Sequence, residues 1–346
     1  MQQPEPVGVI GAGTFGTAMA NLMARNTDVL VYSRQPELVQ RLNRERFRFG
    51  VNLHERITFT SDFAEVADRC QLIFPIVPSD GFRSMMRAVA PHLKPSHVLI
   101  HGTKGLDIGG LSMAEIPARR LTRRDVHTMT DVIHQESVVV RVGALTGPNL
   151  ARELLDGQPS ASVVATKFDE VRERAMRVLK SSQLHVFGTY DLLGAELAGV
   201  LKNVIALGSG ILKGHGMGKN IQAMLLTRGL VEMIHFGEAM GSDKRAFFGT
   251  AGVGDLIATA TSRKSRNYMF GYRIGTGESL EEVRATSQEL AEGVRTLMIT
   301  RHLAQSLRLR VPITEMIYRI VFEQFPVAEA MEYLITYPYD VDVDFL

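Results

Sequence analysis

A glycine motif near the N-terminus constrains the fold of this 346-residue chain more than any other feature. The apolar residues Val7 to Ile10 predict a short strand, which runs directly into G-A-G-T-F-G at Gly11 to Gly16 and then into a helical pattern, Thr17 to Arg25. Between a strand and a helix, such glycines permit a tight turn and close approach of backbone N–H groups to a pyrophosphate. The helix N-terminus adds a field that favours phosphate. We predict a dinucleotide-binding site formed by Gly11, Gly13 and Gly16, with a purely structural glycine turn as the alternative.

The residues after the second predicted strand, Asp28 to Tyr32, indicate which dinucleotide would bind. An NAD-preferring site usually carries Asp or Glu here, because a carboxylate binds the ribose 2′-hydroxyl. This chain has Ser33 and Arg34 instead, and a hydroxyl and a guanidinium suit a 2′-phosphate. NADPH is therefore favoured as cofactor and NADH is the alternative, since an arginine can also simply stack on the adenine.

Short apolar strands alternate with helical patterns as far as residue 190. After a basic segment interpreted as one helix, Gln35 to Asn52, further strands are expected at 57–59, 72–77, 98–101, 137–145, 162–165 and 185–187. This alternation predicts an α/β domain with a Rossmann-type, doubly wound parallel sheet that binds ligands at the carboxyl ends of its strands. Beyond residue 190 the patterns are helical. We predict two domains: an NAD(P)-binding domain, 1–190, and an all-α substrate and catalytic domain, 191–346.

Composition excludes several classes of function. The 39 basic and 37 acidic residues leave a net charge of +2, whereas a nucleic-acid surface needs a concentrated basic excess. The local run Arg119 to Arg124 is interpreted as a solvated helix end or loop, with a polyanion site as the alternative. The single cysteine, Cys70, excludes an internal disulfide and a cysteine-rich zinc site, and no metal is predicted. We find no apolar stretch of membrane-spanning length and no signal pattern, so we expect a cytoplasmic protein without a membrane span.

A lysine lies within a long apolar helical pattern, Glu196 to Asn220. Apolar and small residues repeat there at spacings of three and four, which is typical of a helix packed into a core. Lys202 falls beside this stripe and is followed by Asn203. Desolvation lowers the pKa of a lysine toward the range where it can exchange protons. Lys202 is therefore a candidate acid/base residue, and the alternative is that its ammonium reaches the surface.

Two further segments carry candidate anion-binding residues. Lys104 lies in a glycine-flanked loop after the strand at 98–101, where it could hold a substrate phosphate or remain an ordinary surface lysine. The segment Thr261 to Asn267 holds three cationic and three hydroxyl residues within seven positions, a good composition for binding an oxyanion. A solvated polar loop is the alternative for this second segment.

In combination, these motifs resemble the bacterial-type NAD(P)-dependent glycerol-3-phosphate dehydrogenases. The resemblance covers both predicted domains, and five blocks match in order. They are GAGTFGTA from Gly11, GTKGL from Gly102, LTGPN from Leu145, ELAGVLKNVIALGSGI from Glu196 and GVGDLIATATSRKSRN from Gly252. The resemblance implies a Rossmann-type domain followed by an all-α domain like that of 6-phosphogluconate dehydrogenase. It also implies reduction of dihydroxyacetone phosphate to glycerol 3-phosphate, which supplies phospholipid synthesis.

The resemblance further implies roles for individual residues. Lys202 would be the general acid/base, with Asn203 and Asp255 able to orient it. The substrate-binding positions would be Lys104, Gly147, Asn149, Lys202, Asp255, Ser265, Arg266 and Asn267. The cofactor-binding positions, besides the three glycines, would be Thr14, Phe15, Arg34, Lys104, Ala151, Arg266, Leu290 and Glu292. Family members commonly carry Ser where this chain has Asn149, and often a bulky residue near His101, so substrate affinity would differ.

Two other functions are left open by the sequence. One is a related two-domain hydroxy-acid dehydrogenase, which would bind a carboxylate instead of a phosphate. The other is a non-catalytic redox sensor that binds NADPH and switches partners. The expected partner is a small-molecule substrate and not a nucleic acid. The sequence does not determine the oligomeric state, and a homodimer is compatible with it.

Overall fold

The computed structural model describes residues 5–287, 291–338 and 341. The chain forms two compact units, and each is treated by itself below. The first comprises Met1–Asp107 and Thr128–Leu192, and the second comprises Ile108–His127 and Leu193–Leu346. The predicted division near residue 190 assigned 108–127 to the first domain, whereas in the structure this segment groups with the helical unit.

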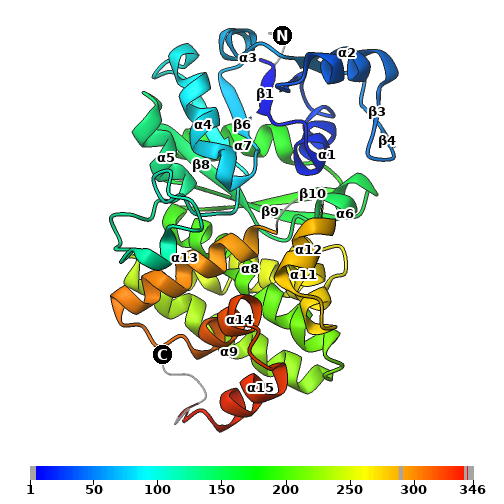
Figure 1. The fold of residues 1–346 in the computed structure, drawn as a ribbon. Helices are drawn as coiled ribbons and strands as arrows, with labels where there is room; N and C mark the ends of the chain where they lie inside the picture. Colours follow the sequence, from blue (N-terminus) through cyan, green and yellow to red (C-terminus); the bar gives the residue numbers. More distant parts are fainter. Residues whose placement is uncertain (1–4, 288–290, 339–340, 342–346) are drawn as a thin grey trace. The chain divides into compact units, whose positions relative to one another are not determined.

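The first unit is built on an eight-stranded sheet (Figure 1), with strand order β10-β9-β8-β7-β6-β1-β2-β5. Its strands are β1 (Val7–Ile10), β2 (Val29–Tyr32), β5 (Ile57–Thr60), β6 (Leu72–Pro75), β7 (Val98–His101), β8 (Arg141–Thr146), β9 (Ser160–Thr166) and β10 (Leu184–Thr189). The strand β1 pairs in parallel with β2 on one side and β6 on the other. The strand order therefore reverses at β1, and in such sheets ligands bind at the carboxyl ends beside this reversal.

One strand pair departs from the predicted parallel sheet, because β9 runs antiparallel to β8. The connection between them holds only the five-residue helix α6 (Ala151–Leu155). A parallel crossover usually carries the chain back to the starting edge through a full helix packed on a face of the sheet. The chain therefore turns back at this point, and the sheet is mixed.

Helices cover both faces of the sheet, and each face has its own apolar core. One core contains side chains from α1 (Thr14–Met23), α2 (Pro36–Glu45), α6 and α7 (Asp169–Leu179). The other contains side chains from α3 (Phe63–Arg69), α4 (Ser79–Val89) and α5 (Met129–Glu136). Alternate residues of β1 divide between the two cores: Val7 and Val9 enter the first, and Ile10 enters the second. This is the two-sided burial expected of a doubly wound sheet.

The predicted helix Gln35 to Asn52 was wrong in its second half. Helix α2 ends at Glu45, and a two-stranded hairpin follows, β3 (Phe47–Arg48) and β4 (Val51–Asn52). Its two turn residues, Phe49 and Gly50, have φ angles of 50° and 81°. Positive φ at both central residues is the geometry of the tight hairpin turn that matches strand twist. The alternation of apolar and polar residues over F-R-F-G-V-N therefore reflects a hairpin.

The second unit is helical (Figure 1). Its helices are α8 (Leu192–Gly214), α9 (Lys219–Ala239), α10 (Asp255–Thr261), α11 (Arg266–Gly275), α12 (Leu280–Thr286), α13 (Glu292–Leu307), α14 (Pro312–Glu323) and α15 (Val327–Thr336). Short 3₁₀ turns occur at Ile116–Ala118 and Lys244–Phe247. Helix α8 is long and apolar enough, by length and composition, to cross a membrane, which the sequence analysis overlooked. Its most apolar window is wholly buried inside the structure, as in the core helix of a folded domain.

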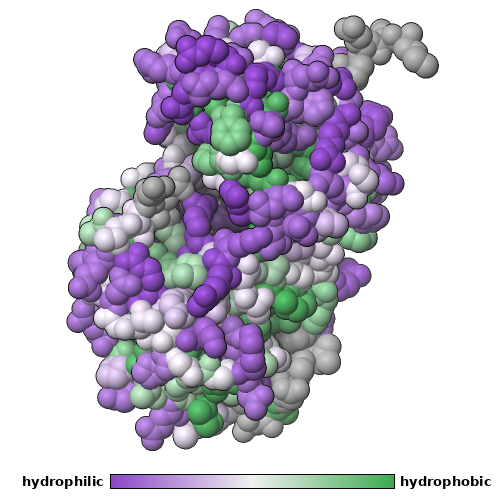
Figure 2. Space-filling view, turned by 90° about the vertical axis from the view of Figure 1, so that its right-hand side faces the viewer, coloured by the Kyte–Doolittle hydropathy of each residue, from purple (hydrophilic) through white to green (hydrophobic). Residues whose placement is uncertain are grey.

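The visible surface in Figure 2 is mainly hydrophilic, and apolar areas interrupt it without forming one continuous face. The large apolar side chains that are exposed come from separated elements, among them Phe47 on β3, Phe187 on β10 and Ile257 on α10. Apolar residues exposed singly are ordinary on a globular protein.

Candidate active site

The glycine loop at the end of β1 has the shape that a dinucleotide pyrophosphate requires. Gly11 has a φ of 121°, and a Cβ there would overlap the carbonyl oxygen of Ile76 on the neighbouring strand connection. A Cβ on Gly16 would overlap the Gly11 carbonyl oxygen. By contrast, a Cβ on Gly13 would meet nothing within 4 Å, and Gly13 is the N-cap of α1 with no side-chain cap. The loop therefore packs tightly on the protein side and leaves the helix N-terminus open, which fits a bound phosphate.

The residues after β2 differ in how accessible they are. Ser33 is buried, and its hydroxyl accepts a hydrogen bond from the Gln35 N–H at 3.5 Å. Arg34 is exposed. Tyr32 stacks on Phe63 with 3.7 Å between ring centroids. Of the two side chains expected to recognise a 2′-phosphate, the guanidinium of Arg34 is the accessible one.

Lys104 and Gly147 lie together at the carboxyl ends of β7 and β8. The Lys104 ammonium donates to the Gly147 carbonyl oxygen at 2.8 Å. Asn149 lies in the same loop as Gly147, and its amide is hydrogen-bonded to nearby residues. Its Nδ2 donates to the Thr146 carbonyl at 3.0 Å, and its Oδ1 accepts from Ser162 Oγ at 2.8 Å. Lys104 is half-buried, so part of its surface remains accessible.

In the helical unit, Lys202 is buried in a polar cluster. It is 5% exposed, and its ammonium forms an ion pair with Asp255, which is 1% exposed. It also donates to Thr259 Oγ1 at 2.6 Å, and Thr259 in turn donates to Asp255 Oδ1 at 3.2 Å. The alternative in which Lys202 extends its ammonium to the surface is therefore wrong. Two opposite charges and a hydroxyl hold each other in a dry environment, where electrostatic interactions are strong.

Helix α10, which carries Asp255 and Thr259, begins in an unusual way. A single π-helical turn, Thr250–Gly254, leads directly into it. Within this turn, a Cβ on Gly252 would overlap the backbone of Phe247. Such π turns are frequent at functional sites. Here the turn places Asp255 in the first position of α10.

The other end of α10 is fixed to α8 by buried side chains. Ser209 donates to the Ala260 carbonyl oxygen at 2.5 Å, and Gln222 on α9 donates to Ser209 Oγ at 2.7 Å. Ser209 lies seven residues after Lys202, which is two turns further along one face of α8. That face therefore contacts α10 at both ends of the short helix, and the contacts fix how Asp255 and Thr259 meet Lys202.

Glycines allow α8 and α11 to cross in direct backbone contact. A Cβ on Gly210 or Gly214 of α8 would overlap the Tyr268 or Tyr272 carbonyl oxygen of α11. The relation is reciprocal, because a Cβ on Gly271 of α11 would overlap the Leu207 carbonyl oxygen. The close crossing sets the position of α11, whose N-terminus carries the predicted oxyanion-binding residues.

The predicted oxyanion-binding residues have three different environments. Ser265 is buried and caps α11, accepting from the Tyr268 N–H at 3.3 Å. Arg266 is exposed at the first position of the helix. Asn267 is buried and bridges helices: its Nδ2 donates to Asn203 Oδ1 at 2.8 Å, and its Oδ1 accepts from the Gly293 N–H at 2.9 Å. An exposed guanidinium beside a helix N-terminus suits an anion.

The remaining candidates are placed as follows. Thr14 and Phe15 are the first two residues of α1, Ala151 begins α6 and Glu292 begins α13. Leu290 lies outside the described residues. Among the residues that the structure describes, no group of three or more His, Cys, Asp or Glu side chains has the arrangement of a metal site.

Thr259 was missed by the sequence analysis. A signal for it was present, because Thr259 follows Asp255 by four residues, and residues at that spacing share a face wherever the chain is helical. Once Asp255 faces Lys202, Thr259 must do so as well. Asn203 was expected to help orient Lys202, and its side-chain oxygen accepts a hydrogen bond from Asn267 Nδ2.

Comparison with known proteins follows the same division of the chain. Residues 6–172 match the family model described as the N-terminus of NAD-dependent glycerol-3-phosphate dehydrogenase, and residues 191–332 match the model of its C-terminus. The chain is also similar to a protein of Ectopseudomonas mendocina (strain ymp) named glycerol-3-phosphate dehydrogenase (NAD(P)+). The two are 36% identical over 351 residues, covering 100% of this chain and 98% of that protein.

Solved structures agree with this similarity. The glycerol-3-phosphate dehydrogenase of Coxiella burnetii superposes with a TM-score of 0.85 at 27% identity, covering 96% of this chain and 99% of that one. The enzyme of the same name from Saccharomyces cerevisiae gives a TM-score of 0.82 at 23% identity, covering 95% of this chain and 99% of that one. The second likeness concerns the fold alone.

Proposed function

Because the chain belongs to the NAD-dependent glycerol-3-phosphate dehydrogenases, we infer that it interconverts dihydroxyacetone phosphate and glycerol 3-phosphate with a nicotinamide cofactor. Family membership favours this activity over the hydroxy-acid dehydrogenase and the redox sensor that the sequence left open. The structural observation that supports it best is the buried cluster of Lys202, Asp255 and Thr259.

We propose that Lys202 is the general acid in the direction of reduction and the general base in the reverse direction. When bound, the nicotinamide cofactor supplies or accepts the hydride at the substrate carbon. The chain must then stabilise the alkoxide that develops on the carbonyl oxygen and deliver a proton to it. The Nζ of Lys202 can do both, and positioned proton transfer contributes roughly 10²–10⁴-fold to the rate. Asp255 and Thr259 fix the direction of the ammonium.

We propose that the N-terminus of α11 binds the substrate phosphate. In this proposal Arg266 provides the accessible guanidinium, and Ser265 orients the helix end by capping it. Asn267 acts by bracing α11 against Asn203 and Gly293, because its amide is used in those two contacts. In the first unit, Lys104, whose ammonium donates to the Gly147 carbonyl, is proposed from the resemblance to contact substrate. Asn149, whose amide is engaged with Thr146 and Ser162, supports the loop that carries Gly147.

For the cofactor, we propose that NADPH is preferred over NADH. The proposal depends on Arg34, which is exposed directly after β2 where a 2′-phosphate would lie. Gly11, Gly13, Thr14, Phe15 and Gly16 would bind the pyrophosphate. Further cofactor contacts are proposed from the resemblance, namely Lys104, Ala151, Arg266, Leu290 and Glu292. A cytoplasmic location, a role in phospholipid supply and a homodimer stay predictions.

The preference for NADPH is tested with Arg34→Asp. The new carboxylate should repel the 2′-phosphate and accept a hydrogen bond from the ribose 2′-hydroxyl. The ratio of kcat/KM for NADPH to that for NADH should therefore fall by at least about tenfold, the effect of losing a single charge-assisted contact. An unchanged ratio would count against the role of Arg34.

The role of Lys202 is tested with Lys202→Ala. Cofactor binding, measured by fluorescence of the reduced nicotinamide, should be retained, while kcat should fall by at least about 10²-fold. The matched control is Lys213→Ala, because Lys213 lies on the same helix but is exposed. Dihydroxyacetone phosphate is compared with its non-phosphorylated analogue in the same assay. Near-normal turnover of Lys202→Ala would refute its role, and equal activity on both substrates would refute the phosphate site.

A further inference from the structure

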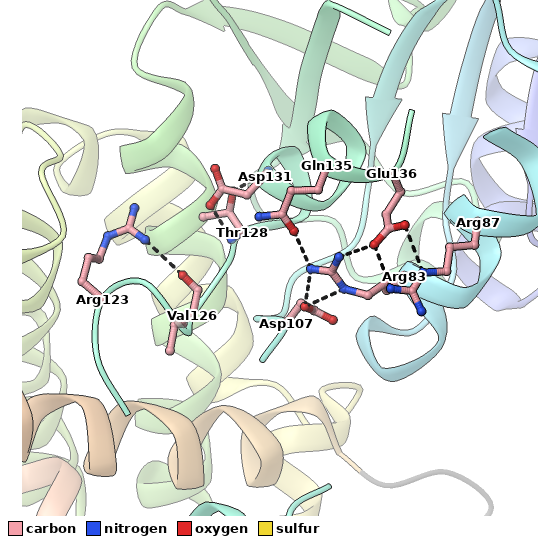
Figure 3. A network of polar contacts seen from close by, with 9 residues as sticks. All are labelled: Arg83, Arg87, Asp107, Arg123, Val126, Thr128, Asp131, Gln135 and Glu136. Atoms are coloured by element: carbon pink, nitrogen blue, oxygen red, sulfur yellow. Dashed lines mark hydrogen bonds and ion pairs between the residues drawn. The ribbon is translucent and has the colours of Figure 1, made fainter. Parts of the chain in front are cut away.

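A network of charged and polar side chains, partly buried at Arg83 and Asp107, lies in the first unit (Figure 3). The Arg83 guanidinium, on α4, is at its centre. Its side chain is 12% exposed, and the Nε and Nη2 groups both donate to Asp107 Oδ2, at 2.9 and 2.7 Å. Asp107 is the last residue of the loop that follows β7, and its side chain is 7% exposed. One arginine thus holds the end of this loop by two hydrogen bonds to a single carboxylate oxygen.

The other contacts of Arg83 fix the arginine itself. On α5, Glu136 forms an ion pair with Arg83, and Gln135 Oε1 accepts from Arg83 Nη2 at 2.7 Å. Arg87, one turn further along α4, donates to Glu136 Oε2 at 3.0 Å. The charges of the two arginines and of the carboxylates of Asp107 and Glu136 therefore balance. Helix α5 holds the Arg83 guanidinium in the orientation that reaches Asp107. Planar guanidinium groups are suited to such multiple recognition of oxygen acceptors.

The loop from Gly102 to Asp107 is fixed at both ends. At its beginning, the Gly102 N–H donates to the Pro75 carbonyl at 3.0 Å, and Thr103 Oγ1 donates to the Val77 carbonyl at 2.7 Å. At its end, Asp107 is held by Arg83. Lys104 lies between these points, so its backbone position depends on both.

We propose that Arg83 is a positioning residue for the reaction, acting on Lys104 through Asp107. This inference rests on the proposed contact of Lys104 with substrate. Arg83 does not need to touch substrate. It determines where the ammonium of Lys104 stands, and misplacing a binding group by 1 Å can cost about 10²-fold in rate.

The test uses Arg83→Gln, with Arg87→Gln as the matched control. Arg87 lies on the same helix and contacts the same Glu136, but its side chain is 66% exposed, and it is not hydrogen-bonded to Asp107 in the part of the chain that the structure describes. Arg83→Gln should raise KM for dihydroxyacetone phosphate about tenfold or more, and its effect on the cofactor Kd should not exceed that of Lys104→Met. Arg83→Lys keeps the charge but not the paired donors, so its KM should lie between that of the unchanged protein and that of Arg83→Gln. Arg87→Gln should stay within about twofold of the unchanged protein on both measures.

A double-mutant cycle separates this role from a general structural one. The Kd for glycerol 3-phosphate is measured by calorimetry with cofactor bound, for Arg83→Gln, Lys104→Met and the double variant. If Arg83 acts through Lys104, Arg83→Gln should have little further effect once Lys104 is Met. Equal weakening in both backgrounds, or cofactor binding that Arg83→Gln still weakens once Lys104 is Met, would overturn the inference.

The outcomes also distinguish this inference from the proposed function. If Lys104→Met leaves the glycerol 3-phosphate Kd unchanged, the assignment of Lys104 fails and Arg83 has nothing to position. If Lys104→Met weakens binding and Arg83→Gln does not, the assignment of Lys104 stands and the inference about Arg83 is wrong. Should Arg83→Gln not fold, Asp107→Asn removes charge from the same contact and must produce the same selective rise in KM.

Discussion

The buried ion pair between Lys202 and Asp255 can be tested by stability, independently of catalysis. The side chains are 6% and 1% exposed, so neither charge is solvated in the folded protein. Lys202→Met removes the ammonium while nearly preserving the length of the side chain. Asp255→Leu removes the carboxylate at similar volume. Each single variant removes one charge of this pair and leaves the opposite charge buried.

The expected magnitudes follow from this burial. Breaking a buried pair by removing one partner costs about 3–5 kcal/mol of unfolding free energy. Replacing both partners by apolar groups is often close to neutral. The double variant also removes two partners of the Thr259 hydroxyl, which costs about 1–3 kcal/mol. We therefore expect about 3–5 kcal/mol for each single variant and about 1–3 kcal/mol for the double variant, so the double is more stable than either single change suggests.

The assay is urea unfolding followed by circular dichroism, because the chain contains no tryptophan to report unfolding by fluorescence. A chain with two compact units need not unfold in one step. Amide hydrogen exchange in α8 and α10 then localises the change to the helical unit. Lys213→Met is the control, since this exposed lysine on the same helix should change stability by less than about 0.5 kcal/mol. Single variants that each cost under about 1 kcal/mol, or strictly additive costs, would refute the reasoning.

Two further expectations concern the helical unit. Gly210→Ala should destabilise the protein by about 1–3 kcal/mol in urea unfolding, because the added Cβ would overlap the Tyr268 carbonyl and lie 2.7 Å from the Tyr272 N. Gly218→Ala, where a Cβ meets nothing within 4 Å, should change little, and equal effects of the two would contradict this. Burial raises the pKa of Glu232 to about 7, although hydrogen bonds from Thr314 act in the opposite direction and lower it. Between its ordinary pKa of 4.5 and about 7, the folded protein therefore keeps a proton that the unfolded chain releases. Stability should fall as pH rises through this window, by on the order of 3 kcal/mol relative to Glu232→Gln, and a pH-independent difference would be inconsistent with it.

The sheet was predictable where local sequence decides the structure. Strands such as Val7–Ile10 and Val98–His101 are short apolar runs bounded by turn residues, and both were found. The direction of β9 was not predictable in this way, because it depends on what the connection from Thr146 to Ser160 can span. The hairpin after Glu45 was missed because its basic residues fit a helix as well as a strand. The turn at Phe49 and Gly50, where φ is positive at both residues, decides between the two.

The site was predictable only in part, since its contacts join helices far apart in sequence. Lys202 could be singled out because a charged residue beside an apolar stripe is conspicuous. Its contacts with Asp255 and Thr259 span more than 50 residues, and no local pattern encodes them. The resemblance supplied Asp255 but said nothing of Thr259. Composition alone gave Ser265, Arg266 and Asn267 one common role, whereas the structure gives them three environments.

The geometry of α8 explains why a lysine and an asparagine stand side by side in it. Successive residues of an α-helix point about 100° apart, so neighbours face different elements. Lys202 faces α10, where it meets Asp255 and Thr259, while Asn203 faces α11 and bonds Asn267. Asn267 continues to the N–H of Gly293 at the start of α13. One buried helix thereby sets the proposed acid/base cluster and the proposed anion-binding helix end relative to each other. We therefore expect replacement of Asn203 to shift α11 and, through the position of Arg266, to raise KM for dihydroxyacetone phosphate.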